Sequence, residues 1–420
     1  MFNKTVSLSQ IVFPTLLGLF ITSSVSFAEN KPSAPVKKQS AACQASSLWC
    51  VDPAKRPKRT DYVKDELLLL YDAGRAENFA ESILRKYNLQ EKASGKLYSI
   101  GQTIITANTN GQDPLDLVGQ IKGQEKSVEA SANNLFFTTA IEQKEGPASY
   151  PLSLTGIKAA HQYTKGKGVK VCMIDTSVDL NHRSLNNAHV QSFQLVSGNA
   201  EINQRHGTEV AGVIISQNPR IGVAPEATLL AISTFTDDPK TGRRTSNAKL
   251  VGKALDLCIR ERVDILNLSF AGRQDPLVDK LIRKAISRGI VVVASAGNNG
   301  PGAGPAYPAA IPNVIAVTAV DQAENIFGQA NRGTYIDLAA PGVDILTTSP
   351  RGSFSLSSGT SLATAHVSGV VALLMSMNRQ GFRASVLEKT AVDLGRSGRD
   401  TDFGYGLVNV ERALQLNKLN

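Results

Sequence analysis

The sequence is poor in the residues that build metal centres and disulfide-rich scaffolds. Its 420 residues include 4 cysteines and 5 histidines, with no Cys-x-x-Cys, no His-Glu-x-x-His and no paired His/Cys cluster. Those spacings are the usual signatures of zinc sites, so no zinc is expected. Cys172 and Cys258 each lie in an apolar run and are expected to be buried small hydrophobic residues. Cys43 and Cys50 lie close together and could close a small disulfide loop.

Long apolar runs and clustered positive charge are also scarce. The net charge of +9 is dispersed, and no Lys/Arg block is interleaved with aromatic residues, so a nucleic-acid partner is not expected. At the N-terminus, Lys4 precedes an apolar stretch, 11–21, that is too short to span a bilayer, and Ser26-Phe27-Ala28 follows. Residues 1–28 are therefore predicted to be a signal peptide, and the protein to be secreted or periplasmic. The competing interpretation is an uncleaved membrane anchor, which Pro14 argues against.

The remaining chain divides into two linkers and two structured regions. Residues 29–59 are rich in Pro, Ser, Ala and Lys, as in a disordered linker. From 62 to 137 the pattern is β-α-β-β-α-β, which predicts a small α+β domain of ferredoxin-like type. After a polar linker, 142–151, apolar strands alternate with helices, the signature of an α/β doubly wound, mostly parallel sheet flanked by helices. The candidate strands are 169–174, 228–232, 265–268, 291–294 and 314–317, and the candidate helices are 207–215, 248–260, 277–288 and 361–377.

Ser361 occupies the most informative position in the chain. It lies in the small and hydroxylated stretch 358–366, which leads directly into an apolar helical run. A serine at a helix start could attack a carbonyl while the free backbone N–H groups stabilise the resulting oxyanion. The same pattern is typical of an ordinary N-cap, so this stretch alone leaves both interpretations open.

Three more polar residues follow predicted strands or begin a helix. Asp175 ends the first buried strand, His206 precedes the helix at 207–215, and Asn298 follows the strand at 291–294. Each has a structural interpretation as a cap or turn residue. Functional sites in doubly wound sheets lie just past the carboxyl ends of the strands, where these residues would meet.

Three segments resemble the signature segments of the subtilisin-like serine peptidases (subtilases). They are Asp175-Thr176-Ser177, the stretch His206-Gly207-Thr208-Glu209-Val210-Ala211-Gly212, and Gly359-Thr360-Ser361-Leu362-Ala363. The order Asp, His, Ser is also that of subtilisin. The resemblance extends over essentially everything after the second linker. It implies that Ser361 is the nucleophile that forms an acyl-enzyme, that His206 is its general base, and that Asp175 orients the imidazole. Asn298 would donate to the oxyanion.

The resemblance also implies where substrate lies. An extended substrate would add a strand to Ser269-Phe270-Ala271 and to the region around 241–245. The pocket for the residue before the scissile bond (P1) would be walled by Ser295-Ala296-Gly297, with Ala306 near its base. No charge is expected at that base, which favours apolar P1 residues. Arg243 and Arg244 could favour acidic residues further upstream, or simply form a solvated loop.

Some positions depart from the family pattern. Ser177 replaces the usual glycine, which matters only if that position requires φ > 0. Ala365 replaces the usual proline in the helix that follows the nucleophile. Loop 216–222 is too short for the calcium-binding loop of many subtilisins, and Ser184 stands where an aspartate would contribute. That metal site is therefore expected to be absent, and no cofactor is expected.

The small domain, taken as residues 60–143, resembles a subtilase propeptide, and residues 144–420 would be the peptidase domain. A propeptide would cover the catalytic face and be cleaved within 138–150, with 142–145 as the favoured position; an unrelated accessory domain is the alternative. The resulting expectation is an exported, monomeric endopeptidase that acts on polypeptides and is made as an autoprocessed zymogen. The alternatives are a catalytically impaired subtilase fold that serves as a binding module, and a lipase-like hydrolase. The latter is disfavoured because no G-x-S-x-G motif surrounds Ser361.

Overall fold

The computed structural model describes residues 61–75, 78–139, 141–143, 150–196, 204–238 and 241–418, with the backbone alone at 141–143 and 417–418. The predicted signal peptide and first linker, including Cys43 and Cys50, lie outside the described residues. So does Lys144, the first residue after the predicted junction at 143–144.

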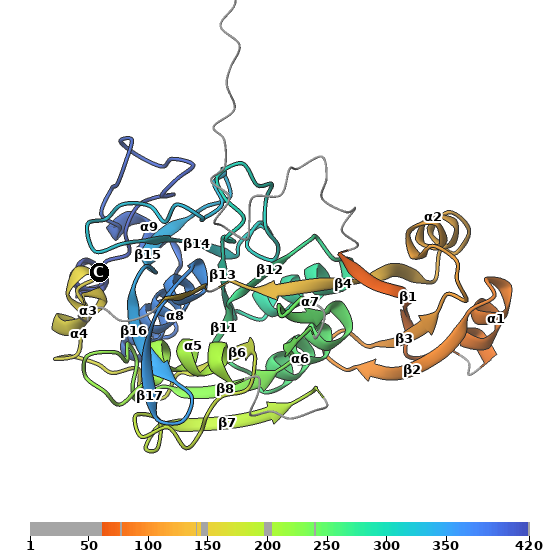
Figure 1. Ribbon diagram of the computed structural model, residues 1–420, viewed down its shortest axis with the longest axis horizontal. Coiled ribbons are helices and arrows are strands. Elements are labelled where there is room, and N and C mark those ends of the chain that lie inside the picture. Colours follow the sequence, from red (N-terminus) through yellow and green to blue (C-terminus); the bar gives the residue numbers. More distant parts are fainter. Residues whose placement is uncertain are drawn as a thin grey trace, which may run out of the picture. The chain divides into compact units, whose positions relative to one another are not determined.

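The N-terminal region is an antiparallel sheet covered on one face by two helices (Figure 1). Its strands have the spatial order β2-β3-β1-β4, and every pair is antiparallel. Helix α2 begins as its sequence suggests, with Asp113 accepting hydrogen bonds from the N–H groups of Leu115 and Asp116 ahead of Pro114 at its first turn. The predicted β-α-β-β-α-β order is confirmed, with bounds β1 Tyr62–Asp72, α1 Asn78–Lys86, β2 Gln90–Leu97, β3 Gln102–Asn108, α2 Pro114–Gln124 and β4 Glu129–Thr138.

The main sheet has seven parallel strands in the order β15-β14-β13-β11-β6-β8-β7. The predicted doubly wound α/β fold is therefore confirmed. Its two outer strands were not predicted: β7 is an exposed, largely polar edge, and β15 is short and ends in a proline. Strand β7 lacks the apolar run that marks a buried strand, and the proline in β15 argues against a strand there. The bounds are β6 Lys170–Asp175, β7 His189–Gln194, β8 Thr228–Ser233, β11 Ile265–Leu268, β13 Val291–Ser295, β14 Ile315–Val320 and β15 Leu338–Pro341.

Helices cover both faces of this sheet. One core is built on α5 (Arg205–Ile215) and α8 (Thr360–Met377), and a second on α6 (Ala248–Arg260) and α7 (Pro276–Ser287). Helix α8 is long and apolar enough to cross a membrane, but its residues are buried from Thr360 to Met375, as expected of a core helix. Shorter helices complete the region: α3 Pro151–Leu154, α4 Ile157–Ala160, α9 Ser385–Thr390 and α10 Val410–Lys418.

Short strands connect the N-terminal sheet to the rest of the protein. Strand β4 pairs with β10 (Arg244–Asn247) on one side and with β12 (Phe270–Gly272) on the other, while β9 (Thr236–Asp237) pairs with β10. Further along the chain, β5 (Ile141–Gln143) pairs with β17 (Ser353–Ser358) of the hairpin that β17 forms with β16 (Ile345–Ser349). The N-terminal region is therefore joined to the α/β region by continuous main-chain pairing.

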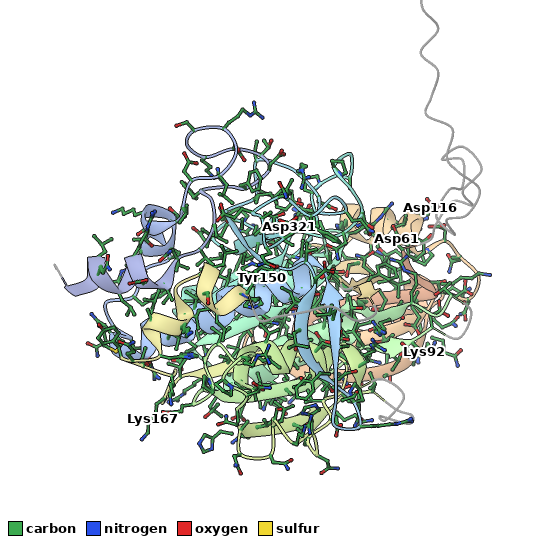
Figure 2. All side chains as sticks on the ribbon, turned by 60° about the vertical axis from the view of Figure 1, so that its left-hand side comes forward. Asp61, Lys92, Asp116, Tyr150, Lys167 and Asp321 are labelled. Atoms are coloured by element: carbon green, nitrogen blue, oxygen red, sulfur yellow. A yellow bond between two sulfur atoms is a disulfide. The ribbon has the colours of Figure 1, made fainter. Side chains whose placement is uncertain are left out.

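Tyr150 marks the point at which the described chain resumes, directly before α3. Its hydroxyl lies 2.7 Å from the carbonyl oxygen of Val343 and 3.2 Å from that of Val320 (Figure 2). Burial raises the pKa of this hydroxyl, so it remains a neutral donor. This contact fixes the start of the α/β region against β14 and the segment just before β16 (Ile345–Ser349).

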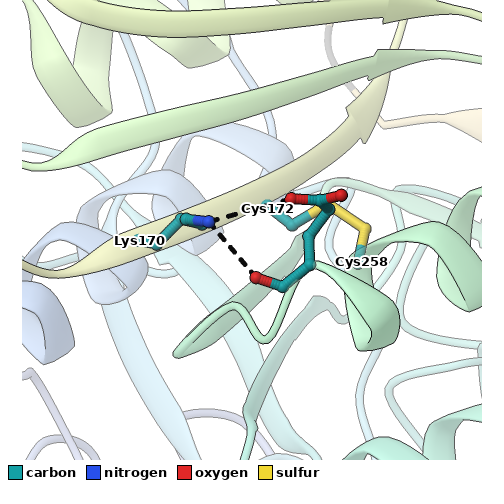
Figure 3. Close-up of a disulfide and its surroundings, with 4 residues drawn as sticks. Lys170, Cys172 and Cys258 are labelled. Carbon is teal, nitrogen blue, oxygen red and sulfur yellow. Dashed lines mark hydrogen bonds and ion pairs between the residues drawn. A yellow bond between two sulfur atoms is a disulfide. The ribbon is translucent and has the colours of Figure 1, made fainter.

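The expectation for Cys172 and Cys258 is half wrong. Both side chains are fully buried, as predicted, but they are joined in a disulfide with 6.1 Å between their Cα atoms (Figure 3). The bond links β6 to α6 across 86 residues of sequence. Two lone cysteines in separate apolar runs carry no sequence signal for pairing, because the pairing depends on how α6 crosses over the sheet. Beside the bond, Lys170 donates to the carbonyl oxygen of Glu261 at 3.2 Å.

Replacing both cysteines, as in Cys172→Ala with Cys258→Ala, should destabilise the protein by roughly 2–4 kcal/mol, because the unfolded chain loses a long covalent loop. The melting temperature of the wild-type protein should fall when a reductant is added under conditions that expose the bond. The double variant should melt at the lower temperature with or without reductant. If Cys172 and Cys258 were alkylated in unfolded protein that had not been reduced, the two thiols would be free and the disulfide assignment would be contradicted.

Candidate active site

Asp175 and His206, two of the predicted site residues, are in direct contact. Asp175 is the last residue of β6, and His206 is the second residue of α5. The Nδ1 atom of His206 lies 2.6 Å from Oδ1 of Asp175, which also accepts from the N–H of Thr176 at 2.6 Å. A carboxylate at this position requires the proton on Nδ1, which leaves Nε2 as a lone-pair acceptor. Within the described part of the chain, Nε2 has no hydrogen-bond partner.

Gly207 allows this close contact. A Cβ atom at this position would lie 2.4 Å from the carbonyl oxygen of Thr176 and 2.6 Å from that of Ser177. Its N–H donates a 2.8 Å hydrogen bond to the hydroxyl oxygen of Thr176. The segment after β6 and the first turn of α5 can therefore approach closely only because no side chain separates them. Ser177 itself is not among the described residues with positive φ, so its replacement of glycine causes no backbone strain.

Ser361 is the second residue of α8, and its hydroxyl faces a carbonyl group of the protein's own chain. Its Oγ donates to the carbonyl oxygen of Thr139 at 2.9 Å, and its backbone N–H approaches the same oxygen at 3.5 Å. Thr139 directly follows β4 and is buried, as Ser361 and His206 are. The chain thus presents one of its own peptide carbonyls to the predicted nucleophile.

Asn298 contacts the same carbonyl oxygen. Its side-chain Nδ2 donates to the Thr139 oxygen. Its Oδ1 accepts from the N–H of Thr360 at 3.2 Å and from the hydroxyl of Thr360 at 2.9 Å, which fixes the orientation of the amide. Two N–H donors therefore converge on one oxygen, the arrangement that stabilises a developing oxyanion. Thr360 was not singled out in the sequence, since its role depends on a contact across the fold.

The chain upstream of Thr139 lies in the predicted substrate groove. Phe137 is paired with Thr245 of β10 and with Ala271 of β12, so β4 is held on both edges. On the β12 side the pairing segment is 270–272, which overlaps the 269–271 expected to pair with substrate. On the other side, the pairing segment is 245–247 rather than 241–245, because 241–243 form the turn before β10.

Five of the residues predicted to contact substrate, Ser269 of the strand-pairing segment and four of the P1 pocket, divide into two groups. Ser269 and Ser295 contact the Thr139 side chain: its Oγ1 lies 3.2 Å from the Ser269 carbonyl oxygen and 3.0 Å from Ser295 Oγ. The second group, Ala296, Gly297 and Ala306, is buried. Ala296 accepts from the Tyr335 hydroxyl at 2.8 Å. A Cβ at Gly297, where φ is +99°, would meet the Cβ of Ala306 at 3.2 Å.

Two aromatic residues of β4, Phe136 and Phe137, make further contacts with the α/β region. Phe136 is fully buried, and its ring packs edge-on against Phe270 with centroids 5.6 Å apart. Gly272 makes room for it, since a Cβ there would lie 2.6 Å from the Phe136 ring. The guanidinium of Arg243 lies over the Phe137 ring, 4.2 Å from its centroid. The described contact of Arg243 with β4 is therefore with an aromatic residue and not with an acidic one.

The loop compared with the calcium loop of subtilisins is a compact turn. The N–H of Gln217 donates to the carbonyl oxygen of Ser184 at 2.8 Å, and the N–H of Asn218 donates to Ser216 Oγ at 3.1 Å. Across the described ranges, no three or more His, Cys, Asp and Glu side chains gather closely enough to hold a metal ion. The absence of a calcium site here remains a prediction.

His366, in the nucleophile's own helix, belongs to the core. Its Nδ1 lies 2.9 Å from the carbonyl oxygen of Leu362. Complete burial lowers its pKa to about 4, so it is neutral under ordinary conditions.

Comparison with known proteins places the chain in a family. The family model described as the subtilase family matches residues 166–406. Subtilisin E of Bacillus subtilis is 34% identical over 366 residues, which cover 78% of this chain and 94% of that protein. Subtilisin of Bacillus pumilus is 36% identical over 281 residues, 64% of this chain and 99% of that protein. The major intracellular serine protease of Bacillus subtilis is 33% identical over 255 residues, 57% of this chain and 79% of that protein.

A solved structure shares the fold. Fervidolysin from Fervidobacterium pennivorans, described as a keratinolytic enzyme related to subtilisin, superposes with a TM-score of 0.72 at 23% identity. The match covers 86% of this chain and 62% of that chain, so this protein spans less than two thirds of it.

Gly207→Ala should disrupt the site, although alanine is the better helix former by about 1 kcal/mol. The new methyl group would collide with two backbone oxygens and push His206 away from Asp175. We expect a loss of reaction with a fluorophosphonate probe and a lower melting temperature. Gly119→Ala is the matched control, because Gly119 lies in helix α2 with open space around its Cβ position. It should leave both readouts unchanged or slightly improved. Equal behaviour of the two variants would contradict the close-approach argument.

Proposed function

The chain belongs to the subtilase family of serine endopeptidases, and on that premise we propose that it is exported as a zymogen that cleaves its own chain after Thr139. The observation that supports this proposal most directly is the Thr139 carbonyl oxygen, which meets the Ser361 hydroxyl, the Ser361 N–H and the Asn298 amide together. A peptide bond held in this way is a substrate bound to its own active site.

In the proposed mechanism, Ser361 Oγ attacks the carbonyl carbon of Thr139. His206 Nε2 takes the hydroxyl proton, since its other nitrogen holds a proton against Asp175. The same imidazolium then protonates the departing amine of Ala140 as the peptide bond breaks, leaving Thr139 as an ester on Ser361. Water, deprotonated by His206, hydrolyses that ester and restores the free serine. Asp175 stabilises the imidazolium in both steps.

The Asn298 amide and the Ser361 N–H hold the oxygen that becomes negative in each step. In the structure both already point at the Thr139 oxygen, so little reorganisation is required as charge develops. The contacts of Thr360 with Asn298 Oδ1 keep the donor nitrogen turned toward the substrate.

The proposed junction lies upstream of the one expected from sequence, which placed the domain boundary at 143–144 with cleavage favoured within 142–145. The polar linker located the region but not the bond, because the bond depends on the pairing register of β4. That register pairs Thr138 with Phe270 and brings the next residue to Ser361. Residues 141–143 continue as a strand on β17, so chain is bound on both sides of the bond, as in an endopeptidase.

The proposed substrates are polypeptides with an aromatic residue four positions before the scissile bond. Phe136 holds that position in the chain's own segment and is buried against Phe270, which itself packs against Phe235 with centroids 5.3 Å apart. Burying a phenylalanine side chain contributes about 2–3 kcal/mol, the largest single apolar contact of this segment.

For the cellular location we propose export, on the basis of the predicted signal peptide at 1–28 and the disulfide between Cys172 and Cys258. Disulfides persist mainly in oxidising compartments. Family membership leaves the compartment open, since one similar protein is named as an intracellular protease. The alternative to the zymogen is a binding module with the N-terminal region as a permanent clamp.

Wild-type protein should carry a mature N-terminus at Ala140, and Ser361→Ala should accumulate uncleaved, because the attacking oxygen is absent. N-terminal sequencing and intact mass would show both results, with circular dichroism confirming that the variant folds. A wild-type chain that remains intact and does not react with a fluorophosphonate would favour the binding module. A mature N-terminus near 144 would retain the peptidase but overturn Thr139 as the cleavage position.

Asn298→Ala should lower kcat on peptide substrates by about 10²- to 10³-fold with a small change in KM. The magnitude is taken over from the equivalent amide of subtilisin and does not come from this geometry. Asn299→Ala is a suitable comparison, because Asn299 is a neighbour whose N–H bonds Asn331 and whose side chain does not face Thr139 in any described contact. Equal losses in the two variants would contradict an oxyanion role for Asn298.

A further inference from the structure

We propose that the P1 pocket selects threonine and serine, and that Ser295 is the residue responsible. This inference rests on the proposed function, since it concerns the residue whose carbonyl is attacked. It replaces the expectation of an apolar P1 residue, which followed from the absence of charge in the pocket.

The side chain of Thr139 makes polar contacts in a closed environment. Its exposed fraction is 6%, and its Oγ1 lies 3.0 Å from Ser295 Oγ and 3.2 Å from the carbonyl oxygen of Ser269. Ser269 and Ser295 are themselves fully buried. A hydroxyl in such a place gives up its contacts with water, so the groups that replace water decide whether it is accepted.

The direction of the hydrogen bonds is determined by the neighbours of Ser295. Its hydroxyl donates to the carbonyl oxygen of Phe270 at 3.1 Å, which leaves its oxygen to act as an acceptor. The Ser269 carbonyl oxygen is an acceptor only. Facing Thr139, the pocket therefore presents two acceptors and no donor in the described contacts. A P1 residue that carries a hydroxyl supplies the missing proton.

Valine provides the sharpest contrast, because it has nearly the shape of threonine with a methyl group in place of the hydroxyl. Bound valine would place that methyl against Ser295 Oγ and the Ser269 oxygen and would leave both without a donor. One hydrogen bond contributes about 0.5–1.5 kcal/mol net, which corresponds to roughly a 3- to 10-fold preference for threonine in kcat/KM. Replacing Ser295 by alanine removes the nearer acceptor and should reduce that preference toward unity.

The test uses the processed enzyme and internally quenched peptides that copy residues 135–143, with threonine, serine, valine or leucine at the position of Thr139. For wild type we expect kcat/KM to be highest for threonine and serine, and 3- to 10-fold lower for valine. For Ser295→Ala we expect the threonine-to-valine ratio to fall to about 1–2. In the full chain, Thr139→Val should slow the appearance of the Ala140 N-terminus by a similar factor.

The outcomes separate this inference from the proposed function. If no peptide is cleaved, and the Ala140 N-terminus appears equally in wild type and in Ser361→Ala or in neither, the proposed function fails. If wild type cleaves the valine or leucine peptide as well as the threonine peptide, the selectivity fails and the peptidase stands. If Ser295→Ala lowers all four rates by one common factor, Ser295 acts only in holding the 270 carbonyl, and its role in selection is overturned.

Discussion

Strand β4 belongs to two structures at once, and this double pairing determines almost everything else in the molecule. Its first half completes the N-terminal sheet against β1, and its second half pairs with β10 and β12 at the edge of the α/β region. Because side chains alternate along a strand, this register sends Phe136 into the core beside Phe270 and leaves Phe137 under Arg243. It also decides which carbonyl reaches Ser361. A slip of one residue would bury the wrong side chain and withdraw Thr139 from the donors that surround its oxygen.

The parts of the fold that could be predicted are those whose signal is local. The central strands are continuous apolar runs, and Asp175 and Asn298 follow two of them, so the main sheet and its polar edge are readable from sequence. The small domain was predicted in element order for the same reason. Strands β10 and β12 have only 4 and 3 residues, and β10 is polar. Strands this short leave no periodicity to detect, and their pairing with β4 follows from contacts across the fold.

Pairings across the fold were beyond prediction for a different reason. Cys172 and Cys258 lie 86 residues apart, and their partnership follows from the packing of α6 on β6. Thr360 and Ser295 look like ordinary small polar residues until Asn298 and Thr139 are placed beside them. The expectation of an apolar P1 residue rests on the absence of charge alone. Hydroxyl and carbonyl oxygens also make a pocket polar, and their direction depends on geometry that a pattern does not contain.

The contacts that hold the N-terminal sheet in place differ greatly in strength. Ion pairs such as Arg273 with Asp61, at 2.9 Å, involve exposed cationic side chains and contribute at most about 1 kcal/mol each. By contrast, Leu68, Leu70, Leu97, Ile104 and Phe136 share one buried core with α6 and α7. The Ser99 N–H also donates to the buried carboxylate of Asp256 at 2.6 Å. None of these contacts involves the bond after Thr139. If the chain is cleaved there, as we propose, these contacts still hold the two regions together, and the active site is uncovered only when the apolar contact itself is lost. In the proposed zymogen, that release, rather than the chemistry of the first cut, determines when the enzyme can accept another chain.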